Sequence, residues 1–99
     1  MLKFHYKARL TTTSPKAVDW AKEMATHFTR VTGTKVDVFM RVGGGNEILF
    51  ASEFPDFDTM VNSRTQMLSD RMAAGAADIG SDEGYLDPGS IDNAIWVSA

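Results

Sequence analysis

The stretch KVDVFMRVGGGNEILFASEF, residues 35–54, decides the fold. Side chains alternate in character along residues 35–42 and again along residues 47–54, which is typical of strands with two different faces. The GGGN segment between them, residues 43–46, suits a turn that needs positive φ. The stretch therefore predicts a β-hairpin. Its first strand sets Val36, Val38, Met40 and Val42 against Lys35, Asp37, Phe39 and Arg41, and its second sets Ile48, Phe50, Ser52 and Phe54 on one face.

The segments before the hairpin predict a strand and a helix. Residues 2–10 alternate between apolar and basic side chains, so this strand has one apolar face and one basic face. Ser14 and Pro15 are suited to the N-cap and first position of a helix that ends at Gly33. The apolar stripe of this helix consists of Ala17, Trp20, Ala21, Met24, Ala25, Phe28 and Val31.

The segments after the hairpin predict a second helix and a last strand. Asp56 or Asp58 can cap a helix whose stripe is Phe57, Met60, Val61, Arg64, Met67, Leu68 and Met72. Residues 73–80 are ambiguous, because their alanines favour helix and their glycines weaken it, so the helix is expected to fray or kink there. Residues 81–90 are predicted to form a loop. Residues 91–99 are β-prone and complete the sheet in a register that the sequence leaves open.

The order β-α-β-β-α-β predicts an α+β, ferredoxin-like fold with a four-stranded antiparallel sheet and both helices on one face. The 99 residues form one domain, 1–99. The uncovered face of the sheet is expected to pack against a second copy of the chain across a two-fold axis. It carries Lys3, His5, Lys7, Arg9, Phe39, Arg41, Leu49, Ala51 and Glu53, with either Ala94, Trp96 and Ser98 or Asn93, Ile95 and Val97.

Composition excludes several classes of protein. With 43% hydrophobic and 23% charged residues, no cysteine and no apolar run long enough for a bilayer, the chain is expected to be globular and not membrane-bound. MLKFHYKARL at the N-terminus does not resemble a secretory signal, so a cytoplasmic location is expected. The net charge of −3 divides into +5 over residues 1–41 and −8 over residues 42–99. The basic residues are dispersed and Phe4 and Tyr6 belong to the apolar face, so no nucleic-acid partner is predicted.

The passage NEILFASEFPDFDTMVNSRTQML, residues 46–68, together with the length and element order, resembles the dimeric α/β barrel superfamily. Within it, the chain is similar to NIPSNAP-like and antibiotic-biosynthesis-monooxygenase-like proteins. The resemblance implies two sheets paired into a barrel, with helices outside and a ligand cavity between sheet and helices or within the barrel. Its members include cofactor-free oxygenases and haem-degrading enzymes, so fold does not select function.

Two departures from the family limit what the resemblance implies. Haem-degrading relatives supply a histidine from the second helix, but residues 56–79 contain none. Oxygenase relatives place an asparagine on the first strand and a tryptophan on the third, where this chain has His5 and Phe50. No cofactor is therefore predicted. No metal site is predicted either, because Asp78, Asp82, Glu83 and Asp87 miss the spacing of a calcium loop.

Candidate functional residues gather on the uncovered face. His5 is the candidate general base and Arg41 the group that stabilises a developing oxyanion. The predicted ligand-binding residues are Arg9, Phe39, Glu53 and Trp96. Open alternatives are that His5 has no task, that Glu53 neutralises Arg41 across the hairpin, and that Trp96 caps a pocket with Tyr85.

The predicted function is binding of a small aromatic or anionic organic molecule, with cofactor-independent monooxygenase-like activity as its catalytic form. The alternative is a non-catalytic dimeric accessory or stress-related binding protein, because no complete catalytic set is present.

Overall fold

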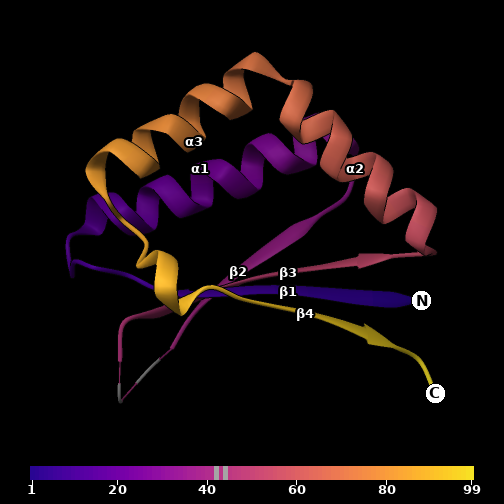
Figure 1. Cartoon of the computed structure of the whole chain (residues 1–99), viewed down its shortest axis with the longest axis horizontal. Helices are drawn as coiled ribbons and strands as arrows, with labels where there is room; N and C mark the ends of the chain where they lie inside the picture. The colour runs from indigo at the N-terminus through magenta and orange to yellow at the C-terminus, as the bar shows by residue number, and fades with distance from the viewer. Residues whose placement is uncertain (42, 44) are drawn as a thin grey trace.

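The computed structural model describes residues 1–41, 43 and 45–99, and it confirms the α+β ferredoxin-like fold. Val42 and Gly44, which the sequence assigned to the second strand and the hairpin turn, lie outside the described residues. The predicted second helix is two helices, as Figure 1 shows. In chain order the elements are β1 (Leu2–Arg9), α1 (Pro15–Thr32), β2 (Val36–Met40), β3 (Glu47–Phe54), α2 (Phe57–Ser69), α3 (Arg71–Glu83), the short 3-10 helix η1 (Pro88–Ser90) and β4 (Asp92–Val97).

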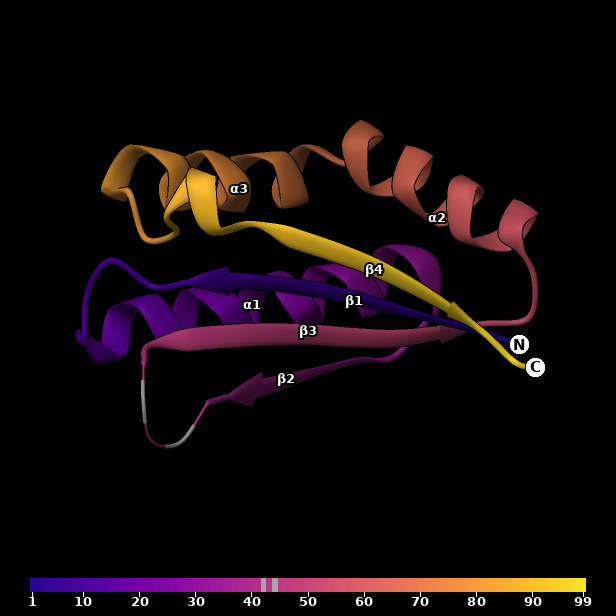
Figure 2. The ribbon, with the colours of Figure 1, turned by 60° about the horizontal axis from the view of Figure 1, so that its bottom comes forward.

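The four strands form one antiparallel sheet in the order β2-β3-β1-β4 (Figure 2). β1 lies in the centre, with Phe4 opposite Ser52 on β3 and opposite Ile95 on β4. Residues directly opposite each other share a face, so the register of β4 places Ile95 toward the helices. The sequence left open which β4 residues belong to the uncovered face, and this register settles that choice. Ala94 and Trp96 are on the uncovered face, opposite His5 and Lys3.

The three helices lie on one side of the sheet (Figures 1 and 2). α1 begins as predicted, since Ser14 accepts a hydrogen bond from the backbone N–H of Lys16 at 3.3 Å. It ends at Gly33, whose φ of 74° closes the helix with a bond to the Thr29 carbonyl. The helix buries Ala17, Ala21 and Ala25. Such small side chains let neighbouring elements approach closely.

The expectation of fraying or a kink within residues 73–80 is wrong, because the chain breaks earlier, at Asp70 between α2 and α3. Residues 73–80, left ambiguous by the sequence, lie inside α3. The carboxylate of Asp70 accepts a hydrogen bond from the backbone N–H of Ala73 at 2.9 Å, so it caps the new helix. α3 continues to Glu83, and the prediction that residues 81–83 belong to a loop is therefore wrong. Gly84, with a φ of 65°, supplies the helix stop that the sequence did not identify.

α3 approaches α1 so closely that one position admits only glycine. Gly80 is buried, and a Cβ added to it would overlap Cζ2 and Cε2 of Trp20 and lie 2.8 Å from Nε1. The Trp20 indole N–H donates to the Ala76 carbonyl at 2.7 Å, which fixes the ring against α3. The conflict between glycine and helix that made this segment ambiguous therefore has a packing reason.

Asp70 also joins α3 to α1 through an ion pair, with Arg30 Nη2 2.8 Å from its Oδ1. The hydrogen bond from Arg30 is the main cause that lowers the pKa of Asp70 to about 2, and the bond from the Ala73 amide acts in the same direction. A carboxyl whose pKa is depressed in the folded state contributes stability above its unfolded pKa and loses it as pH falls. Asp70 therefore loses its stabilising contribution as the pH falls from about 4 to about 2.

We expect Asp70→Asn to lower the melting temperature at pH 6, and the difference from the wild type to shrink as pH falls from 5 to 2. Asparagine keeps the cap but removes the charge that pairs with Arg30. Melting followed by circular dichroism at several pH values measures this difference. Asp78→Asn on the same helix is the control. A difference that stays constant down to pH 2 would show that the charge of Asp70 does not stabilise the fold.

No helix among the described residues is long and apolar enough to cross a membrane.

The two central strands each have one buried face and one more exposed face. β1 and β3 bury Leu2, Ala8, Ile48 and Phe54 beneath the helices. The predicted alternation of faces is confirmed along both strands.

Candidate functional site: a cavity between sheet and helices

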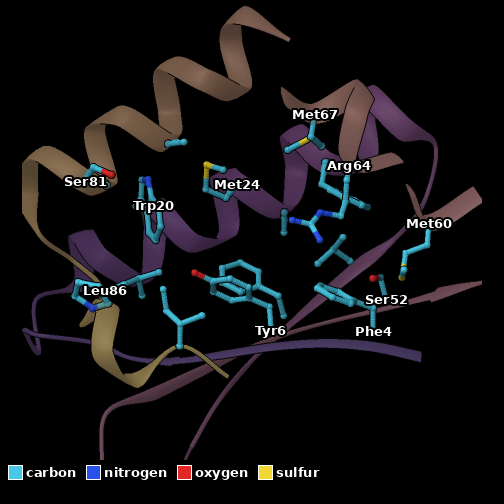
Figure 3. Close-up of a pocket in the computed structure, with 18 of the residues that line it drawn as sticks. Phe4, Tyr6, Trp20, Met24, Ser52, Met60, Arg64, Met67, Ser81 and Leu86 are labelled. Carbon is cyan, nitrogen blue, oxygen red and sulfur yellow. The ribbon is translucent and has the colours of Figure 1, made fainter. Parts of the chain in front are cut away.

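The helices do not pack down onto the whole sheet. A cavity of about 700 Å³ remains between the helix-facing side of the sheet and α1, α2 and α3. Figure 3 shows it extending from the end near Trp20, Ser81 and Leu86 to the end near Met60 and Ser52. Its walls consist of Phe4, Tyr6, Thr11, Trp20, Met24, Ala25, Phe28, Val36, Phe50, Ser52, Phe54, Met60, Arg64, Met67, Ala77, Gly80, Ser81, Gly84, Leu86, Pro88 and Ile91.

The floor of the cavity is aromatic. Because side chains alternate along a strand, β1 and β3 direct Phe4, Tyr6 and Phe50 to the same side as the helices. Tyr6 and Phe50 are directly opposite each other and meet edge to face, with ring centroids 5.9 Å apart. The floor thus offers flat, apolar surface to which another ring can stack.

The helix side of the cavity, opposite the aromatic floor, is lined by flexible side chains. Met24 of α1 and Met60 and Met67 of α2 line the cavity, and Figure 3 shows Met24 and Met67 above Tyr6. Methionine has an unbranched, polarisable side chain that adjusts to irregular shapes. Their positions on the apolar stripes of the helices predict core residues. In the structure they lie on the face of each helix that points toward the sheet, where they border the cavity.

At one end of the cavity the Trp20 ring is held by a hydrogen bond and an aromatic contact. The Trp20 ring, held by the bond to Ala76, lies 5.7 Å from the Tyr85 ring between centroids. Figure 3 shows Trp20 beside Ser81 and Leu86 at this end. Trp20 is consequently positioned to report on whatever occupies the cavity.

Few polar groups line the cavity. Burial raises the pKa of the Tyr6 phenol, so at neutral pH it remains protonated and can donate a hydrogen bond. Ser52 is only 7% exposed, and Arg64 extends from α2 into the cavity (Figure 3). Among the described lining residues there is no carboxylate and no histidine. The cavity therefore supplies hydrogen-bond donors and one positive charge, without a strong base.

The residues predicted as the site lie on the other side of the sheet. His5 is opposite Ala51 and Ala94, at the middle of the uncovered face. Phe39 and Trp96 stand on the two edge strands of that face and are 54% and 61% exposed. The sheet itself separates them from the cavity. Their roles in catalysis or ligand binding stay predictions.

The structure does not bring Arg9, Arg41 and Glu53 together. Each of the three side chains has its own partner: Arg9 pairs with Asp87 at 2.6 Å, Arg41 with Glu47, and Glu53 with Lys3 at 3.6 Å. In the β1–β3 register Arg9 is opposite Glu47 whereas Glu53 is opposite Lys3, six residues away. The expectation that Glu53 neutralises Arg41 is therefore wrong, because Glu47 does so.

A further expectation is also wrong. Trp96 and Tyr85 do not cap a common pocket, because Trp96 is on the uncovered face and Tyr85 packs against Trp20. None of the described cavity-lining residues, Arg64 included, was predicted from the sequence as part of a site. A signal was present, because Arg64 falls within the apolar stripe of its helix, where a charged side chain needs either a partner or a ligand.

No protein-family model and no curated protein matches the chain. Solved structures do match it. An uncharacterised NIPSNAP domain protein from Burkholderia xenovorans superposes with a TM-score of 0.81 and 16% identity, covering 100% of this chain and 95% of that one. A NIPSNAP family protein with unknown function from Agrobacterium tumefaciens gives 0.82 and 19% identity, covering 100% of this chain and 88% of that one. The likeness is one of fold.

A second group of similar structures has a named activity. SnoaB, a cofactor-independent oxygenase from Streptomyces nogalater, superposes with a TM-score of 0.72 and 10% identity, covering 99% of this chain and 92% of that one. The resemblance to NIPSNAP-like and monooxygenase-like proteins is thus confirmed for the fold. Identities this low carry no site residue across.

Proposed function

We propose that this protein binds a small aromatic or anionic organic molecule in the cavity between its sheet and its helices. The observation that supports the proposal is the cavity itself. Protein interiors are normally close-packed, and ligand sites of about 300–1,000 Å³ are mostly apolar with a few placed polar groups. This cavity, at about 700 Å³ with an aromatic floor and a few polar side chains, fits that description; the polar residues are Tyr6, Thr11, Ser52, Arg64 and Ser81.

Trp20 allows the proposal to be tested directly. The sequence has two tryptophans, and Trp96→Phe leaves Trp20 as the only indole. Titration with anthracenemethanol, a neutral aromatic probe, is expected to quench Trp20 emission in a saturable way. In Trp20→Phe, the remaining Trp96 lies on the other side of the sheet and should not respond. Absence of saturable quenching in Trp96→Phe would contradict the proposal.

A pair of alanines on α3 tests where the probe binds. Ala77 is exposed and lines the cavity, whereas Ala74 is exposed and does not. We expect Ala77→Phe, in the Trp96→Phe background, to weaken probe binding about 10-fold or more by occupying space in the cavity, since buried apolar contact carries most of the affinity. Ala74→Phe should leave affinity unchanged. Equal affinities of the two variants would place the probe elsewhere.

A cofactor-independent oxygenase is the second candidate function, favoured by the fold shared with SnoaB. In such a reaction the substrate itself, as an enolate or phenolate, must supply electrons to dioxygen. The described cavity wall holds no carboxylate or histidine to remove a proton. A substrate that ionises easily is therefore required. Oxygen uptake with an anthrone, compared with Arg64→Gln, tests the activity, and uptake no faster than without protein would exclude it for that substrate class.

We also propose that the uncovered face pairs with a second copy of the chain. Its charges are largely matched within the face, through Lys3–Glu53, Lys7–Glu47 and Arg41–Glu47. A face with balanced charges does not repel its own copy, and the exposed rings of Phe39 and Trp96 lose their contact with water on pairing. A two-fold axis would bring equivalent surfaces together.

A further inference from the structure

Arg64 differs in its surroundings from the arginines that serve the fold. Arg9, Arg30 and Arg41 each hold a carboxylate, of Asp87, Asp70 and Glu47 respectively. No ion pair and no side-chain hydrogen bond between described residues involves Arg64. Its side chain nevertheless points from α2 into the cavity, above the aromatic floor (Figure 3).

Arg64 is also the only charged side chain among the described cavity-lining residues. Around it are Met60, Met67, Phe4 and other apolar groups, which do not compensate a positive charge. A cation beside low-dielectric walls creates a local field that attracts an anion more strongly than the same cation on an open surface. Although Arg64 keeps exposure to solvent, its setting favours an anionic group inside the cavity.

Ser52 adds a hydroxyl to the same cavity. It is on β3 at the Met60 end (Figure 3), and the residue is 7% exposed. No buried side-chain polar atom of the described residues lacks a hydrogen-bond partner, so the preference for an anionic ligand comes from Arg64, and Ser52 supplies a further donor.

We infer that the ligand of this cavity is an apolar, ring-containing molecule with one carboxylate or enolate group, which Arg64 binds. The inference rests on the proposed function and specifies its ligand class. One guanidinium matches a single negative charge and can hold a planar carboxylate through two parallel N–H bonds. A phosphate monoester, with nearly two charges, finds no second cation among the described residues of the wall. The apolar body lies over Tyr6 and Phe50 toward Trp20.

The test compares two probes of the same shape. Anthracenecarboxylate and anthracenemethanol differ in charge, and both are titrated into the Trp96→Phe protein with Trp20 emission as the readout. We expect the carboxylate to bind about 10- to 100-fold more tightly, the range of a charge-assisted hydrogen bond. In Arg64→Gln the ratio of the two affinities should fall to about 1, chiefly because the carboxylate binds more weakly. Arg64→Lys should restore part of the preference.

Arg71→Gln is the matched control. Arg71 is exposed at the start of α3, outside the cavity wall, and no described carboxylate pairs with it. It should leave the preference intact, and equal melting temperatures of all variants show that the fold is unchanged. If both probes bind equally and Arg64→Gln changes nothing, the anionic ligand class is wrong while the cavity still binds aromatics. If neither probe binds, the proposed function fails, and this inference with it.

Discussion

Replacement of Gly80 by alanine is expected to lower the melting temperature of this protein by about 10–20 °C. The added methyl group would overlap the ring of Trp20, whose indole is held between Ala76 and Tyr85. Overpacking of this kind costs about 1–3 kcal/mol, and displacement of the ring also breaks its hydrogen bond, worth about 1 kcal/mol. For a domain of this size, each kcal/mol corresponds to about 4–8 °C.

Gly75 provides the matched control for this prediction. It is in the same helix, and a Cβ added there meets nothing within 4 Å. Gly75→Ala should stabilise the protein by about 0.5–1 kcal/mol, because alanine favours helix and restricts the unfolded chain. Thermal and urea unfolding of the two variants gives the comparison. Gly80→Ala as stable as Gly75→Ala would show that α3 and α1 are not in the close contact described.

A double variant separates steric overlap from other causes. Trp20→Phe removes the ring atoms with which the new methyl group collides, and it also removes the bond to Ala76. In this background Gly80→Ala should cost much less than in the wild type, because the two changes share one site and are not additive. An undiminished cost would trace the loss of stability to the helix rather than to the ring.

The sequence predicts most of the fold because strand alternation and helix caps are local signals. Ser14, Gly33 and Asp56 mark helix ends that the structure confirms. The break at Asp70 was harder to predict, since its cap depends on Arg30, forty residues away, as well as on the local Ala73 amide. The need for glycine at position 80 likewise comes from a distant residue, because an added Cβ would overlap the Trp20 ring.

The candidate site was less predictable for a different physical reason. An apolar side chain that faces a cavity has the same spacing as one that faces another side chain, so Met24 and Met67 were assigned to the core. The charged residues of the uncovered face could be assigned to the correct side of the sheet but not to partners. Which residue lies opposite Arg41 depends on the length of the turn, and the structure shows Glu47 there instead of Glu53.

The second large expected effect comes from a substitution on the uncovered face of the sheet. Trp96→Asp is expected to convert a dimer at micromolar concentration into a monomer, with an increase of about 100-fold or more in dissociation constant. Aromatic residues supply the large effects in most interfaces, and an added carboxylate would have to be desolvated. Light scattering coupled to gel filtration measures the molar mass. Trp96 is on the uncovered face and is not among the described cavity-lining residues, so the fold and anthracenemethanol binding to the cavity should persist.

The position of Trp96 makes this outcome specific to one mode of pairing. β4 and β2 are the two edges of the sheet, with Trp96 on one and Phe39 on the other. In a face-to-face pair related by a two-fold axis, each copy presents both edges, so a single substitution alters the interface twice. Leu68→Asp, at an 82% exposed apolar position on α2, changes a helix on the opposite side of the sheet and should leave the dimer intact. A wild type that is monomeric at micromolar concentration, or a dimer lost only with Leu68→Asp, would contradict pairing through the sheet and place any interface on the helices instead.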